Sequence, residues 1–196
     1  MKNKPLWILL GGIVLISAAF LLLNFRAAVS STQTGKLITT MDLGDNMPVA
    51  MQRKDKISIV LVGEGPLVSA LQKSLAEELD QAEIGEIELV GEPEPVYQNP
   101  VLLVKVGEPG PIWTPFFAMS RFSIHAGYAS DGDSTFMEAV EATHTSVAKK
   151  DVANMYAEYE LNDRSFGLIS RRGYHQFLAD YFAQEIVAAL KDLYKV

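Results

Sequence analysis

The sequence predicts an α+β protein: a single N-terminal transmembrane helix followed by a mixed β-sheet of about five strands, with two helices packed on one face. Three observations support this prediction. An apolar run without a charged side chain extends from Leu6 to Leu23. Short β-branched segments alternate with polar turns later in the chain, and two segments carry apolar residues at helical spacing.

The apolar run has about the 20 residues that a helix needs to cross a bilayer. Lys2 and Lys4 precede the run and Arg26 follows it, so the positive-inside rule favours a cytoplasmic N-terminus. We therefore expect residues 1–26 to be a signal-anchor of a single-pass membrane protein, with the lipid bilayer contacted through Leu6 to Leu23. Two alternatives remain: a signal peptide cleaved near Ala28-Val29-Ser30, and a buried helix of a soluble protein.

The remaining chain divides into an expected linker at residues 27–56 and an extracytoplasmic α+β domain at residues 57–196. The linker stretch is rich in Ser, Thr, Gly and Asn and has no sustained period, although some alternation would permit a short strand. Cysteine is absent, so the fold contains no disulfide bond and no thiolate metal site.

The first half of the domain predicts a parallel βαβ unit. Ile57 to Val62 is apolar on both faces, which is typical of a strand in the middle of a sheet. Pro66 suits the first turn of a helix whose leucines recur every four residues. Ile84 to Val90 then alternates apolar and acidic residues, as a half-exposed strand does.

The second half predicts three more strands and a closing helix. The strands are expected at Val101 to Val106, Phe116 to Tyr128 and Ala153 to Leu161, with a turn at Asn162-Asp163-Arg164. Residues 135–149 mix helical and strand signals, and the turn around Asp131 favours a hairpin strand. The most periodic helix of the domain follows Gly173.

Composition and motifs exclude several functions. The formal net charge of −7 argues against nucleic-acid binding, which requires concentrated positive charge. The chain lacks the Gly-x-Ser-x-Gly elbow of many serine hydrolases, the lysine of a phosphate loop, and the close histidine spacing of common zinc sites. We therefore predict no catalytic residue, no metal site and no cofactor. The motifs considered and interpreted as structural are Gly63-Glu64-Gly65, Asp131 with Asp133, and the histidines His125, His144 and His175.

One basic group stands out at the entry to the last helix. It comprises Arg164, Arg171, Arg172 and His175, and we predict that it contacts an anion or an acidic partner. The alternative is that the arginines pair with nearby Asp163 and Asp180 at the surface.

Trp113 lies in a loop stiffened by Pro111 and Pro115. A large aromatic side chain in such a loop is typical of an interface anchor or of a contact with a membrane surface. The alternative is that it caps the hydrophobic core.

These observations favour a membrane-tethered, noncatalytic binding or assembly module of the cell envelope with an envelope protein as its partner. The alternative is a small membrane-anchored hydrolase that uses a dispersed set of His, Ser and Asp residues. A histidine within hydrogen-bond reach of a serine in a concave pocket would favour the enzyme.

Overall fold

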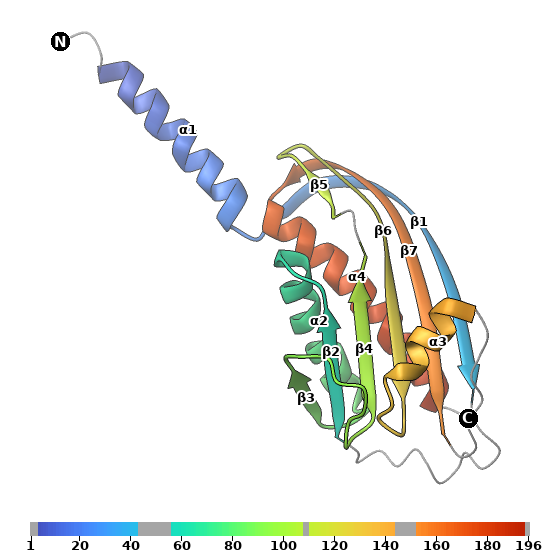
Figure 1. Ribbon diagram of the computed structural model, residues 1–196. Helices are drawn as coiled ribbons and strands as arrows, with labels where there is room; N and C mark the ends of the chain where they lie inside the picture. The colour runs from blue at the N-terminus through green and yellow to red at the C-terminus, as the bar shows by residue number, and fades with distance from the viewer. Residues whose placement is uncertain (1–3, 43–55, 108–109, 144–151, 195–196) are drawn as a thin grey trace.

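A computed structural model describes residues 4–42, 56–107, 110–143 and 152–194 (Figure 1). Four helices and seven strands occur in these ranges. In chain order they are α1 (Lys4–Leu22), β1 (Arg26–Asp42), β2 (Ile57–Val62), α2 (Pro66–Ala82), β3 (Ile87–Val90), β4 (Val101–Val106), β5 (Ile112–Trp113), β6 (Phe117–Ala129), α3 (Thr135–Thr143), β7 (Asn154–Ile169) and α4 (Arg171–Tyr194).

The strands form one mixed sheet in the order β1-β7-β6-β4-β2-β3, and β5 pairs with the end of β6. Strand β2 runs parallel to both β3 and β4, whereas the β4·β6, β6·β7 and β1·β7 pairs are antiparallel. The parallel β2·β3 pair around α2 confirms the predicted βαβ unit. The apolar residues of β2 and β4 are buried on both faces because helices cover the sheet on both sides there.

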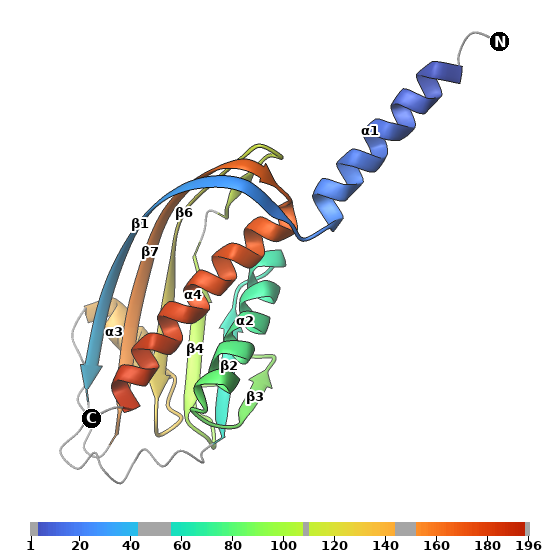
Figure 2. The same ribbon diagram turned by 180° about the vertical axis from the view of Figure 1, so that it is seen from behind.

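The sheet carries α2 and α4 on one face and α3 on the other (Figures 1 and 2). Strands β1, β7 and β6 are long and arch over α4, which Figure 2 shows in front of the sheet. The larger core lies on the α4 side, where Phe122, Tyr159 and Phe182 pack ring against ring. A smaller core lies under α3 and includes Phe136 and Met137. On the α3 side, the parts of β1, β7 and β6 that α3 does not cover are exposed to solvent (Figure 1), and we call this surface the solvent face.

The prediction of two helices and about five strands was incomplete, and the strand favoured at residues 135–149 was wrong. Residues 135–143 form α3, and residues 144–149 lie outside the described residues. The Asp133 carboxylate accepts hydrogen bonds from the Thr135 N–H and hydroxyl groups, and this Asx turn leads into a helix where a hairpin was expected. The predicted turn at Asn162-Asp163-Arg164 is also absent, because β7 runs through it without a break.

Residues 26–42, mostly inside the stretch interpreted as a linker, form β1 instead. This strand pairs with β7 from Arg26 opposite Ile169 to Asp42 opposite Asn154, with one irregularity between Ala27 and Ser30. The sheet therefore begins well before residue 57.

The N-terminal segment forms α1, which projects away from the sheet (Figure 1). Within the described residues, no helix is both long and apolar enough to cross a membrane. The predicted transmembrane signal-anchor at Leu6 to Leu23 was therefore wrong, as were the single-pass topology and the orientation inferred from it.

Candidate functional site

A small pocket opens where β2 and β4 end, beside the beginning of α2. We call it the switch-point pocket, because the chain leaves β2 for β3 on one side and returns to β4 on the other. Such a crevice at the carboxyl ends of parallel strands is where open α/β sheets bind ligands. Its volume is about 270 Å³. The lining residues are Gly63, Glu64, Pro66, Leu67, Val68, Val106, Gly107, Gly110, Pro111, Arg171 and His175.

The first turn of α2 supplies backbone donors to this pocket. Gly65 precedes the helix and makes no side-chain cap, so the N–H groups of Leu67 and Val68 have no capping side chain. Gly63 and Gly65 have φ angles of 137° and 103°, a region that favours glycine. Free N–H groups and the positive end of the helix dipole together favour an anion.

Helix α4 begins at the same edge of the sheet as α2. Strand β7 runs parallel to β2 because it is antiparallel to β6, which is antiparallel to β4, so both helices follow strands that end at this edge. Ser170 caps α4: its hydroxyl oxygen accepts the Gly173 N–H at 2.9 Å and donates to the Phe25 carbonyl at 2.9 Å. This clasp fixes the start of α4, and Arg171 and His175, one turn apart on the helix, line the pocket.

His175 is the buried polar side chain of the site. It is only 6% exposed, lines the pocket, and makes no hydrogen bond to any residue that the structure describes. Burial, and then the positive charge of Arg171, lower the pKa of His175 below its ordinary value. Its ring nitrogens are not among the fully buried atoms that lack a partner in the described residues, so they stay open to the solvent of the pocket. The neutral imidazole is therefore available to donate a hydrogen bond to a ligand.

Arg171 and His175 also line an adjoining depression of about 380 Å³ between α2 and α4. Arg172 and Lys73 face this depression, and the end of α1 contributes Leu21. Lys73 also forms an ion pair with Glu77 on the next turn of α2. The predicted cluster of Arg171, Arg172 and His175 is therefore present, and α2 adds a lysine that the sequence analysis did not include.

The surface pairing offered as the alternative for these arginines is not seen. Asp163 faces the core and accepts hydrogen bonds from Tyr174 and Ser165. Asp180 accepts hydrogen bonds from Ser74 and Gln176. Among the residues with described positions, Arg171 and Arg172 form no ion pair.

Arg164 does not join the other predicted residues. It lies in the middle of β7, opposite Thr32 of β1 and Met119 of β6, on the solvent face of the sheet. Successive residues of a strand point to opposite faces, so the buried position of neighbouring Asp163 sends Arg164 outward.

Trp113 lies in β5 and is half-buried against the larger core. Its indole N–H donates to the Ile169 carbonyl at 3.0 Å, which ties β5 to the end of β7. This placement matches the core-capping alternative, and a role as an interface aromatic stays a prediction.

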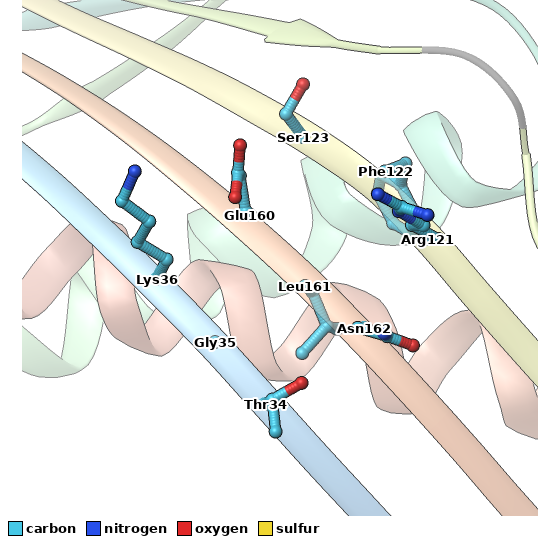
Figure 3. A pocket seen from close by; sticks show the side chains of 9 residues that line it. All are labelled: Thr34, Gly35, Lys36, Arg121, Phe122, Ser123, Glu160, Leu161 and Asn162. Atoms are coloured by element: carbon cyan, nitrogen blue, oxygen red, sulfur yellow. The ribbon is translucent and has the colours of Figure 1, made fainter.

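A second, wider depression of about 540 Å³ lies on the solvent face of β1, β7 and β6 (Figure 3). Figure 3 shows Lys36, Glu160 and Ser123 projecting to the same side of the sheet, with Arg121 on β6 nearby. The Ser123 hydroxyl oxygen lies 3.3 Å from His125 Nε2, and His125 Nδ1 lies 2.7 Å from the Tyr156 hydroxyl. This is the serine–histidine contact that would favour the hydrolase alternative.

The surroundings of Ser123 do not complete a hydrolase site. A hydrolase needs free N–H groups that stabilise the negative oxygen of the reacting carbonyl. Strand β6 is paired with β4 on one side and β7 on the other, so the backbone N–H groups near Ser123 are already hydrogen-bonded within the sheet. Glu141, 3.8 Å from His125 Nδ1, also pairs with Lys105 at 3.0 Å. The cluster ties α3 to the sheet.

The two histidines that the structure describes, His125 and His175, do not share a site. His125 lies on the α3 side of the sheet and His175 on the α4 side, while His144 lies outside the described residues. The described part of the chain contains no group of three His, Asp or Glu side chains that could hold a metal ion.

The lowered pKa of His175 predicts that stability depends on pH. In the unfolded chain this histidine binds a proton below about pH 6.5. In the folded protein its pKa is lower, so it binds the proton only at a lower pH. The free energy of unfolding should therefore fall as pH decreases through this window. Arg171, Arg172 and Lys73 oppose the added charge, and exposed Glu64 only partly offsets them.

Urea unfolding at pH 7.5 and 5.5 measures this effect. We expect His175→Gln to reduce the loss of stability between the two values by up to about 1 kcal/mol. His125→Gln, on the other face of the sheet, is the matched control. An identical pH dependence in wild type and His175→Gln would contradict the assignment.

The fold and the pocket define a class of protein: a small α+β protein with a crevice at the carboxyl ends of its parallel strands. No protein-family model matches the chain, and no curated protein matches it. The chain has distant likenesses to several solved structures.

Two crystal forms of the PelC dodecamer from Paraburkholderia phytofirmans, one of a point variant, cover 80% of this chain and 97% of their own at 14% identity, with TM-scores of 0.40 and 0.43. A minor lipoprotein from Acinetobacter baumannii covers 69% of this chain and 91% of its own at 10% identity, with a TM-score of 0.33. At such values the likenesses carry no argument about function.

Proposed function

We propose that this protein is a noncatalytic binding module that holds an anionic group, such as a phosphate or carboxylate, in the switch-point pocket. The observation that carries the proposal is His175, a buried imidazole without a described partner that lines the pocket beside Arg171 and the uncapped start of α2. Because a guanidinium, an imidazole and backbone N–H groups are all donors, an anion satisfies them together.

The charges around the pocket predict the affinity for such a group. Glu64 lines the rim and is exposed, so its carboxylate offsets part of the positive potential of Arg171. The remaining attraction comes from the helix dipole and from hydrogen bonds. We therefore expect modest affinity for a bare anion and tighter binding of a ligand whose apolar part contacts Leu67, Val68 and Val106.

Calorimetric titration with inorganic phosphate and with small carboxylates tests the proposal. Arg171→Gln should weaken binding about tenfold or more, since a hydrogen bond to a charged group contributes about 1.5 to 3 kcal/mol. His175→Gln should weaken it less. Glu64→Gln should strengthen it, because a like charge is removed from the rim.

Arg164→Gln is the matched control, since Arg164 is an arginine of the same predicted group that lies on the opposite face of the sheet. Equal binding by wild type and Arg171→Gln, or no binding of either anion by the wild type, would contradict the proposal. An acidic protein partner would use the same donors, and capture dependent on Arg171 but not on Arg164 would identify that kind of ligand.

A further inference from the structure

The free edge of β1 is the longest unpaired strand edge in the part of the chain that the structure describes. Strand β1 has 17 residues and forms one end of the sheet, whereas the opposite end is the four-residue strand β3. Residues 30–36 are all exposed. An edge of this kind presents a row of backbone N–H and C=O groups that can pair with another strand.

Native proteins usually protect such an edge with charged residues, proline or bulges. Here the irregularity between Ala27 and Ser30 affects only the beginning of the strand. Between Arg26 and Asp42 the single charged residue is Lys36, and no proline occurs. The stretch from Ser30 to Thr34 therefore has no such protection.

The side chains of this stretch are complementary to themselves. Its sequence is Ser30-Ser31-Thr32-Gln33-Thr34. If a second copy runs antiparallel with Thr32 opposite Thr32, then Ser30 lies opposite Thr34 and Ser31 opposite Gln33. Cross-strand pairs of Ser and Thr are favourable in antiparallel sheets. Such an arrangement is isologous, which a two-fold axis requires.

Charge also favours a second copy in this register. Lys36 would lie opposite residue 28 of the other copy, which is an alanine, so the two lysines are kept apart. Arg164 neighbours Thr32 on β7, and both β1 strands would separate the two Arg164 side chains. The chain has a net charge of −7, yet this edge brings no carboxylates together.

We propose that β1 is a self-association surface, on which residues 30–34 pair antiparallel with the same residues of a second copy and join two sheets into one. The surface is separate from the switch-point pocket, which lies at the carboxyl ends of β2 and β4. Association would therefore leave the pocket open.

Single-cysteine variants of the full chain test both the surface and its register, because the wild-type chain contains no cysteine. Residues directly opposite in an antiparallel pair have Cβ atoms about 4.5 to 5.5 Å apart, near the range for a disulfide. We expect Thr32→Cys to form a covalent dimer under mild oxidation. Thr34→Cys should not, because its two cysteines lie four positions apart along the paired strands. Gln81→Cys, at an exposed position of α2, measures the rate of cross-linking by random collision.

The double variant Thr32→Lys/Thr34→Lys tests the equilibrium by sedimentation over a range of concentrations. It should raise the dimer dissociation constant at least about tenfold. The charge-matched control is Gln81→Lys/Gln98→Lys, at two exposed positions away from β1. The proposal is overturned if Thr32→Cys cross-links no faster than Gln81→Cys, if Thr34→Cys cross-links in its place, or if the two lysine variants associate equally.

Discussion

Replacement of Asp163 by alanine should lower the free energy of unfolding by about 2 to 4 kcal/mol, because two buried hydroxyl groups lose their acceptor. Asp163 is fully buried on β7, where its carboxylate accepts hydrogen bonds from the Tyr174 hydroxyl at 2.7 Å and the Ser165 hydroxyl at 2.9 Å. Burial lowers the pKa of Arg26, and the nearby charge of Asp163 offsets only part of that effect. Removal of the carboxylate leaves these donors without their acceptor inside the core.

Equilibrium unfolding in urea at pH 7.5 measures this loss. The matched control is Asn162→Ala, the exposed neighbour on the same strand, which should change stability by less than about 0.5 kcal/mol. Asp163→Asn keeps the shape and one acceptor, so its cost should be intermediate. A loss below about 1 kcal/mol for Asp163→Ala would show that the network contributes little.

Replacement of Gly173 by alanine should cost about 2 kcal/mol, although alanine is the better helix former by about 1 kcal/mol. A Cβ atom at this position would overlap the Phe25 carbonyl oxygen and lie 2.8 Å from the Ser170 hydroxyl oxygen. Both neighbours belong to the clasp that holds the first turn of α4. The chain after α1 must therefore move or the helix must shift.

Thermal or urea unfolding of Gly173→Ala tests this close approach. Gly91→Ala is the control, since a Cβ there meets nothing within 4 Å. A Gly173→Ala variant as stable as wild type would indicate that the Phe25 segment yields without cost. Displacement of α4 should also weaken anion binding, because Arg171 and His175 lie on the displaced turn.

The sequence predicted the elements whose periodicity is strong and whose contacts are close along the chain. Strands β2 and β4 match their predicted bounds, and α2 begins at Pro66 as expected. Strand β1 was missed because its Ser- and Thr-rich edge has no apolar alternation, and its partner β7 lies more than a hundred residues later. The turn at Asn162-Asp163-Arg164 was wrongly predicted because these residue types are common in turns. In β7, Asp163 instead accepts hydrogen bonds in the core, and its two neighbours face solvent.

The candidate site was only partly predictable for a similar reason. Proximity in sequence identified Arg171, Arg172 and His175. The turn before α2 was recognised but interpreted as structural, since the motif lacks the residues of a phosphate loop. The start of α2 lies beside the start of α4 because β2 and β7 run parallel. Local sequence periodicity does not reveal that the two strands are parallel. Arg164 is separated from the group because β7 is continuous and its alternation turns Arg164 to the solvent face. The sequence predicted a turn at this position instead.

The most direct test of the anion site is a phosphate titration followed by backbone amide NMR of the wild type and of Arg171→Gln/His175→Gln. We predict that the largest shifts in the wild type occur at the N–H groups of Leu67 and Val68, the uncapped donors of α2. In the double variant these shifts should need at least about tenfold more phosphate. Largest shifts around Lys36 and Arg121 on the solvent face, or equal titrations of the two proteins, would contradict the account.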